Sequence, residues 1–243
     1  MNDLKINQFF INISKLCELL FPIHRCITGN GTRETLKILK KKIKLEIYEI
    51  PTGTKAFDWQ IPQEWNILDG YILNENNEKI VDYKKSNLHV LQYSVPINKK
   101  LSLKELKKHL FTNSKHPNLI PYVTSYYSKN WGFCLSYNEF LKLKDETYHV
   151  MIDSKLTNGS LTYGELLIEG KIKSEILIST YICHPSLYND NLSGIVLTTL
   201  LAEYFLKNKP YYSIRFLFVP ETIGSIAWLS NNEKKIQNIE HGL

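Results

Sequence analysis

Three polar side chains stand where a parallel β-sheet would place chemistry. His184 follows a buried strand, Asp190 stands at the entrance to the next helix, and Glu221 follows a second buried strand. Open parallel sheets bind ligands beyond the carboxyl ends of their strands, so neighbouring strands would direct these side chains into one crevice. Histidine and carboxylates are the ligands and general bases of zinc hydrolases, in which the metal lowers the pKa of its bound water to about 7. The spacing therefore favours a zinc-dependent hydrolytic site.

Each of these residues also has a simpler interpretation. Asp190 could cap the following helix and complement its dipole. Glu221 could be a solvated carboxylate in the first turn of the next helix, and a single histidine after a strand is commonly a hydrogen-bonded structural residue. The coincidence of His184, Asp190 and Glu221 at one sheet edge favours the metal site over three separate explanations.

The elements that would position this site form a βαβ unit. Glu175–Ile182 is a continuously apolar segment of strand length, which is typical of a strand buried on both faces. Leu192–Leu206 has the apolar positions of a helix that packs on a sheet, and Ser213–Val219 is a second buried strand. The spacing predicts parallel strands joined by a right-handed crossover, followed by a helix over Ile223–Lys235.

The rest of the chain predicts an α/β fold with an inserted module. Amphipathic helices are expected over residues 4–20 and from Thr32 onward, where Thr32 can act as the N-cap. From residue 52 the pattern changes to short β-type segments divided by turns, with a capping box at Ser102–Glu105. The strands predicted after residue 44 are Leu45–Ile50, Ile67–Leu73, Lys79–Tyr83, Leu88–Val95, Leu119–Tyr127, Trp131–Ser136, Tyr148–Asp153 and Leu161–Leu167.

These patterns divide the chain into three parts. Residues 1–51 are assigned to the N-terminal part of an α/β domain, 52–140 to an inserted β-rich domain, and 141–243 to the continuation of the α/β domain. The fold class is therefore α/β, with a mostly parallel sheet flanked by helices and a C-terminal part that looks truncated.

Composition excludes several classes of protein. No apolar run approaches the roughly 18–20 residues of a membrane span, and Asp3 and Lys5 interrupt any signal-peptide core, so we expect a cytoplasmic protein. The four cysteines form no CxxC pair and are expected to be reduced and buried. The net charge is +6, and the dense run at Lys40–Lys44 is interpreted as a solvated helix face, so we expect no nucleic-acid and no membrane partner.

Several motifs resemble known zinc peptidases. The segments Asn189–Gly194 and Phe218–Ser225 look like the Asp-containing and Glu-Glu-x-Gly segments of the di-zinc aminopeptidases and glutamate carboxypeptidases. A closer resemblance covers the whole chain: it is similar to bacterial aminopeptidase-like proteins that carry an inserted β-domain and a helical C-terminal domain. The segments that carry this resemblance are Phe21–Ile23, Thr28–Leu36, Lys85–Val90, Thr124–Tyr127 and Gly159–Glu165.

The resemblance implies a role for each candidate residue. His184 and Asp190 would be metal ligands, Glu221 would be the general base, and the Asp190–Asn191 peptide bond would be cis. Thr222 departs from the pattern, because the related enzymes have a metal-binding glutamate there. This departure and the short interval between His184 and Asp190 favour one zinc ion over two. Further ligands of the related enzymes would follow residue 243, and His241 is not assigned to the site.

The sequence thus predicts a zinc-dependent, aminopeptidase-like hydrolase that acts on a peptide or an amide-containing small molecule. One alternative is a non-catalytic binding or scaffold protein with the same fold, because a fold does not guarantee activity. Another is a carbohydrate- or peptide-binding role for the inserted module. We also expect the chain to be a fragment that is inactive by itself and poorly soluble or homo-oligomeric, because Ser213–Val219 would be left at an open sheet edge.

Overall fold

A computed structural model describes residues 3–243, with side chains from residue 10 onward. The chain forms two compact units, which are described separately. One unit, named here the α/β unit, comprises Met1–Glu64 and Asn158–Leu243, and the other, the inserted unit, comprises Trp65–Thr157. No helix among the described residues has both the length and the apolar character needed to cross a membrane.

The α/β unit is built around a mixed sheet. Within the described residues this sheet has five strands in the order β1-β10-β12-β11-β13. The pairings of β1 with β10 and of β10 with β12 are antiparallel, whereas β12 with β11 and β11 with β13 are parallel. The α/β class is confirmed, and only the half of the sheet that carries the candidate site is parallel. The bounds are β1 Glu46–Pro51, β10 Ser160–Ile168, β11 Ile172–Tyr181, β12 Tyr212–Val219 and β13 Ile239–Gly242.

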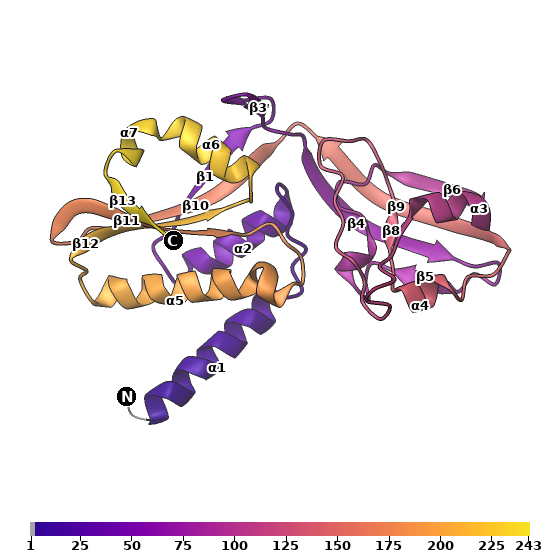
Figure 1. The fold of residues 1–243 in the computed structure, drawn as a ribbon, viewed down its shortest axis with the longest axis horizontal. Helices are drawn as coiled ribbons and strands as arrows, with labels where there is room; N and C mark the ends of the chain where they lie inside the picture. The colour runs from indigo at the N-terminus through magenta and orange to yellow at the C-terminus, as the bar shows by residue number, and fades with distance from the viewer. Residues whose placement is uncertain (1–2) are drawn as a thin grey trace. The chain divides into compact units, whose positions relative to one another are not determined.

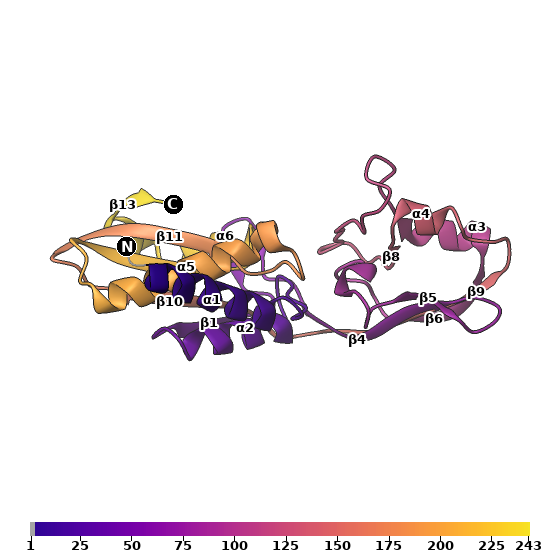
Figure 2. The same cartoon turned by 90° about the horizontal axis from the view of Figure 1, so that it is seen from below.

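Helices cover both faces of this sheet. Helices α1, α2 and α5 lie on one side of it, and α6 and α7 lie on the other (Figure 1). Seen from below, α1, α2 and α5 lie in front of the strands (Figure 2). The bounds are α1 Asp3–Leu20, α2 Asn30–Lys40, α5 Ser193–Lys207, α6 Ile223–Asn231 and α7 Glu233–Ile236.

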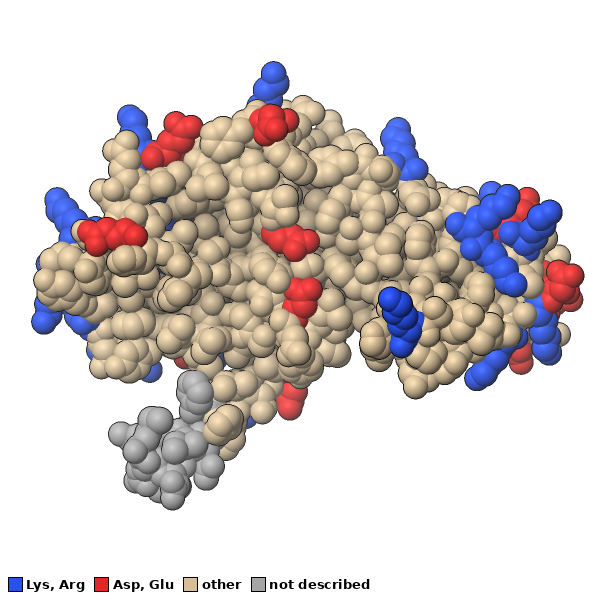
Figure 3. Space-filling model, in the orientation of Figure 1, with Lys and Arg blue, Asp and Glu red and all other residues tan. Residues whose placement is uncertain are grey.

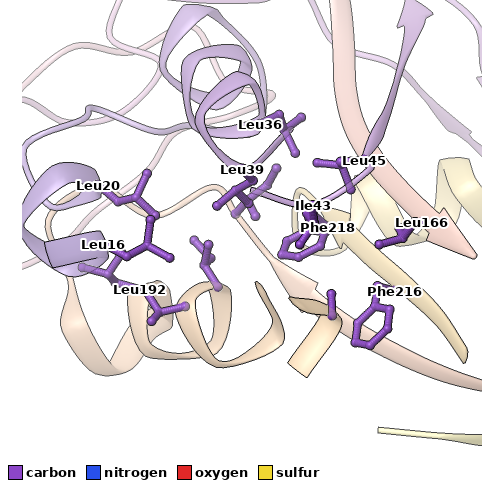
Figure 4. Close-up of a cluster of buried hydrophobic side chains, with 14 of the residues drawn as sticks. Leu16, Leu20, Leu36, Leu39, Ile43, Leu45, Leu166, Leu192, Phe216 and Phe218 are labelled. Carbon is purple, nitrogen blue, oxygen red and sulfur yellow. The ribbon is translucent and has the colours of Figure 1, made fainter. Parts of the chain in front are cut away.

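The main core fills the space between the sheet and α1, α2 and α5. Leu16 and Leu20 come from α1, Leu36 and Leu39 from α2, and all four side chains are at most 2% exposed. They meet alternate residues of β10 and β12 (Figure 4), as the helical and strand periods of the sequence predict. Burying one such leucine contributes roughly 1.5–3 kcal/mol. The other labelled members of the cluster are Ile43, Leu45, Leu166, Leu192, Phe216 and Phe218.

The opposite face of the sheet holds a buried ionic network. Arg215 on β12 donates to both oxygens of Glu175 on β11, at 2.6 and 2.8 Å, and also to Glu165 on β10. Trp228 on α6 donates to the second oxygen of Glu165 at 2.8 Å. Arg215, Glu165 and Glu175 are at most 5% exposed, so one guanidinium ties three adjacent strands together.

The inserted unit is a β-rich module with its own core. Its larger sheet has the order β5-β4-β9-β6, and β7 and β8 form a separate pair. Both short helices α3 and α4 begin with a capping box, and the one at Ser102 and Glu105 was predicted. The bounds are β4 Glu64–Leu73, β5 Lys79–Asp82, η1 Asn87–His89, β6 Ile97–Ser102, α3 Leu103–Leu106, η2 Lys107–His109, β7 Leu110–Phe111, β8 Phe133–Cys134, α4 Tyr137–Phe140 and β9 Thr147–Thr157.

The boundaries of the insertion lie later in the chain than 52 and 140. Residues 52–64 belong to the α/β unit, where the hairpin of β2 (Lys55–Ala56) and β3 (Trp59–Gln60) contacts α6. The strand predicted at Tyr148–Asp153 lies within β9, which pairs with β6 in the inserted sheet. Alternation identifies a strand but does not identify the sheet that it joins.

Other predictions from the strand patterns need correction. Ser213–Val219 is not at an open edge, because β12 pairs with β10 on one side and β11 on the other. Strand β11, predicted to be buried on both faces, is mostly half-buried. Leu88–Val95 and Leu119–Tyr127 form isolated bridges and not strands. The apolar content of the first segment reflects burial over residues 89–94, whereas the second is half-buried to exposed.

Charged side chains of both signs are interspersed on the face drawn in Figure 3. Lys40, Lys41 and Lys42 are exposed at the end of α2, as predicted for a solvated helix face. Lys42 lies 3.9 Å from the carboxylate of Glu203, a separation at which an exposed pair contributes little.

Arg33 binds both chain segments that connect the α/β unit to the insertion, one ending at Glu64 and the other beginning at Asn158. From α2 it donates to Glu49 on β1 at 2.8 Å, to Glu64 at 2.5 and 2.7 Å, and to Ser160 at 2.9 Å. Glu64 and Ser160 lie next to the two chain crossings, and both are buried. Burial would raise the pKa of Glu49, but hydrogen bonds from Arg33 and Ser160 outweigh it and hold that pKa below its ordinary value.

Replacing Arg33 by methionine should lower the free energy of unfolding by about 3 kcal/mol, because Glu64 would keep a buried charge without its cation. Urea unfolding at neutral pH measures this change, and Lys37→Met on the same helix, at an exposed position, is the control.

The folded-state pKa of Glu49 is depressed, so the stability that Glu49 contributes is complete above its unfolded pKa of about 4.3. That contribution disappears as pH falls through the folded-state pKa, and the difference between wild type and Arg33→Met should shrink there. Equal stability of the two chains at neutral pH would contradict this role.

Candidate metal centre

The parallel pairing of β11 and β12 brings the predicted site residues to one edge of the sheet. Tyr181, the last residue of β11, pairs with Val219, the last residue of β12. The amide of Ile182 then donates to the carbonyl of Val219 at 2.9 Å, which extends the pairing toward His184. Glu221 follows Val219 by two residues, so the two strand ends present an imidazole and a carboxylate side by side.

His184 lies between two carboxylates. Its Nδ1 is 3.4 Å from Oδ1 of Asp190, and its Nε2 is 3.5 Å from Oε1 of Glu221. The imidazole is 4% exposed, whereas the side chains of Asp190 and Glu221 are 54% and 36% exposed. The structure thus assembles the three predicted residues, with a buried ring between two solvent-facing acids.

This arrangement fits the donor chemistry of a zinc site. Two ligand atoms that share one tetrahedral zinc at 2.0–2.2 Å lie about 3.3–3.5 Å apart, and the pair of His184 Nδ1 and Asp190 Oδ1 has that separation. An imidazole holds one metal through one nitrogen and donates its remaining N–H to a second-shell acceptor. Because its two nitrogens face different carboxylates, His184 can bind a metal beside one and donate to the other.

Asp190 lies on an irregular turn before α5. The turn η3 spans Tyr188–Leu192, and within it Asp190 and Asn191 have non-helical backbone angles. The Asp190–Asn191 peptide bond is cis, as the resemblance implies. The Asn191 amide donates to the hydroxyl of Thr180 at 2.7 Å and to the carbonyl of Tyr181 at 3.0 Å, which holds the turn on the end of β11.

The helix-cap interpretation of Asp190 is wrong for the described structure. Helix α5 begins at Ser193 with Leu192 in the cap position, and no side chain among the described residues caps its amides. The Asp190 carboxylate instead accepts a hydrogen bond from the hydroxyl of Tyr181 at 2.7 Å.

Tyr181 is a site residue that sequence reasoning missed. Its ring packs edge-on against His184 with centroids 5.2 Å apart, so it contacts both predicted ligands. The hydrogen bond to Asp190, followed by burial, raises the pKa of Tyr181 to about 12, so its hydroxyl remains a donor at neutral pH. The available signal was its place as the last residue of a strand that ends at the site.

Arg25 holds the backbone of the site at His184, and sequence reasoning also missed it. It is fully buried, and it donates to the backbone carbonyl of His184 at 3.0 Å and to that of Leu20 at 2.6 Å. Burial lowers the pKa of Arg25 to about 10, so it stays cationic at neutral pH. A lone arginine within the apolar stretch Ile23–Ile27 was the signal for such a buried role.

Cys183 adds a sulfur atom to the site. The ligand atoms of Cys183, His184 and Glu221 all lie within 4.8 Å of one another, and they are the one group of this kind found among the described residues. The sulfur accepts the amide of Glu221 at 3.3 Å, and burial raises the pKa of the thiol to about 12. Cys183 is free and buried, as predicted for the cysteines, and it fixes the backbone that carries Glu221.

Two other residues lie where the sequence could not place them. His241, left unassigned, pairs with Ile176 near the start of β11, so it is remote along the strand from His184. Thr222, in the place of the second glutamate of the related enzymes, precedes α6 with a positive φ of 53° and is exposed.

Comparisons with known proteins agree with this architecture. Residues 14–243 match a family model described as a domain of unknown function, DUF4910. A protein of Clostridium acetobutylicum, named as a candidate polysaccharide biosynthesis protein with an aminopeptidase-like domain, is 54% identical over 98% of this chain and 57% of its own length. The chain therefore spans just over half of that relative. A crystal structure of a candidate peptidase from the same species has a TM-score of 0.93 at 53% identity, over 98% of this chain and 58% of that one.

More distant structures share the fold. A zinc aminopeptidase from Bacillus subtilis has a TM-score of 0.64 at 12% identity, over 96% of this chain and 67% of that one. An M28 peptidase precursor from Shewanella amazonensis has a TM-score of 0.61 at 10% identity, over 96% and 69% of the two chains. The chain belongs to the DUF4910 family and has the mixed α/β fold of the M28 aminopeptidases.

Proposed function

We propose that this protein is a zinc-dependent, aminopeptidase-like hydrolase that cleaves an amide or peptide bond near a free amino terminus. The observation that carries the proposal is the buried imidazole of His184, held between the carboxylates of Asp190 and Glu221 at the carboxyl edge of parallel strands. That edge is where open α/β sheets bind their ligands. The names of the relatives and the shared aminopeptidase fold support the same reaction class.

His184 and Asp190 would hold the zinc ion. Nδ1 of His184 and Oδ1 of Asp190 have the separation of two ligands of one ion. A bound zinc ion would supply Lewis-acid polarisation of the scissile carbonyl and a lowered pKa for a water molecule. One ion is favoured over two, because Thr222 offers no carboxylate where a second metal would need one.

Glu221 would move the protons of the reaction. Its Oε1 faces Nε2 of His184, so the N–H there can orient the carboxylate. Oε2 is left to take the proton of the attacking water and to return it to the leaving amine. The side chain is 36% exposed, so water and substrate can reach it without unfolding of the edge.

The proposed substrate class rests on the relatives and the shared fold. Asp190 and Glu221 are solvent-facing carboxylates on either side of one buried ring, and a bound zinc ion would offset their charge. The relatives are named as an aminopeptidase-like protein and as zinc aminopeptidases, which act at a free amino terminus. A peptide or a small amide with a free amine is therefore the proposed substrate, and a non-catalytic binding protein, favoured by Thr222, is the competing function.

Zinc affinity tests the proposed ligands. His184→Ala and Asp190→Asn should each weaken zinc binding about 100-fold or more, because each removes one of few donor atoms. Isothermal titration of the metal-free chain measures the dissociation constants, with Asn208→Ala as the control, because Asn208 lies exposed at the far end of α5. If His184→Ala binds zinc as tightly as the wild type and the Asn208→Ala control do, His184 is not a zinc ligand.

Glu221→Gln tests the proposed base. This change keeps the shape of the side chain but removes its ability to take a proton, so hydrolysis should fall by about 10²–10⁴-fold. Zinc affinity should stay within about threefold of the wild type. The measurement is turnover of aminoacyl anilides by the protein at the length of its relatives, of which this chain spans just over half. Glu233→Gln, at an exposed position on α7, is the matched control. Unchanged turnover in Glu221→Gln would favour a different base, and zinc binding without any turnover would favour the non-catalytic function.

A further inference from the structure

Tyr181 contacts the candidate metal centre at two points. Its hydroxyl donates to Oδ1 of Asp190 at 2.7 Å, and this is the same oxygen that lies 3.4 Å from Nδ1 of His184. Its ring packs edge-on against the imidazole at 5.2 Å. One side chain therefore touches both proposed ligands.

Asp190 needs such a partner because it is the most exposed of the three site residues. Its side chain is 54% exposed and lies on the irregular turn η3, whereas His184 is buried and its backbone is held by Arg25. A half-exposed aspartate without a fixed partner samples several rotamers. The hydrogen bond from Tyr181 selects the rotamer that points Oδ1 toward His184.

Tyr181 is itself anchored on a rigid element. It is the last residue of β11, it pairs with Val219 of β12, and its carbonyl accepts the side-chain amide of Asn191. The side chain of Tyr181 thus fixes the Asp190 carboxylate, which lies on a turn, relative to the end of strand β11. Sites hold a metal well when the groups that orient the ligands are themselves held by regular structure.

We propose that Tyr181 is a positioning residue of the metal centre, which orients the Asp190 carboxylate toward the metal through its hydroxyl group. This inference rests on the proposed function, because it requires that His184 and Asp190 hold a metal ion. Groups that orient metal ligands typically contribute 10–100-fold to metal affinity. The hydroxyl of Tyr181 should do the same, while the ring contributes packing that Phe would retain.

The test compares Tyr181→Phe with wild type in zinc titrations and in the visible spectrum of the cobalt-substituted protein. Zinc affinity should fall by about 10–100-fold, and the cobalt bands should shift because the ligand geometry changes. Tyr188→Phe is the matched control. Tyr188 is a half-exposed tyrosine on the same turn, its ring packs at a tilt against Phe21 with centroids 5.0 Å apart, and its hydroxyl makes no hydrogen bond among the described residues.

A double-mutant cycle separates positioning from a general structural effect. If Tyr181 acts through Asp190, Tyr181→Phe should change zinc affinity by less than about twofold in the Asp190→Asn background. The melting temperature of the metal-free chain should differ little between wild type and Tyr181→Phe. Wild-type affinity in Tyr181→Phe, or an equal loss in both backgrounds, would overturn the positioning role alone. Failure of the wild-type protein, at the length of its relatives, to bind zinc or cobalt would overturn this inference and the proposed function together.

Discussion

The parallel register of β11 against β12 is the constraint on which the candidate site depends. His184 and Glu221 are separated by 36 intervening residues, and they meet because Tyr181 and Val219 end their strands side by side. Helix α5 between the strands supplies the crossover that a parallel pair requires, and the turn before it carries Asp190. Each of the three side chains therefore owes its place to one βαβ unit, and the antiparallel half of the sheet serves mainly to complete the core beneath it.

The site combines a buried centre with a solvent-exposed rim. His184 is buried, its carbonyl is held by Arg25, and its ring is bounded by Tyr181 and the two acids. The carboxylates themselves face solvent, where a substrate amine could meet them. A buried imidazole between exposed acids is well suited to a metal, because the ring cannot turn away while the acids remain accessible.

The sequence was informative where the signal is local or periodic. The βαβ unit, the apolar faces of α1 and α2, the capping box at Ser102 and the shared edge of His184, Asp190 and Glu221 follow from spacing alone. Arg25 and Tyr181 were missed because their function depends on partners that periodicity does not reveal, and Arg25 contacts a residue 159 positions away. Thr32 was assigned to a helix cap, but it lies inside α2, where its hydroxyl donates to the carbonyl of Cys26 at 2.5 Å. The domain boundaries were misplaced for a related reason, since β9 alternates like any strand and only its pairing assigns it to the inserted unit.

The ionic network around Arg215 has a consequence for how the strands can be assembled. A slip of β12 by one residue would turn Arg215 toward the apolar core formed by α1, α2 and α5. Glu175 would then be buried without its cation, and Glu165 would keep only Lys235. Hydrophobic side chains tolerate such a shift far better than a buried charge does, because one apolar contact can replace another. The guanidinium of Arg215 therefore favours the observed register. A sheet in another register would lose these ion pairs on the face opposite the main core, which costs free energy. The same register of β11 against β12 places His184 beside Glu221. Arg215 contacts neither residue, yet by favouring this register it helps to bring the two strand ends together at the candidate metal centre.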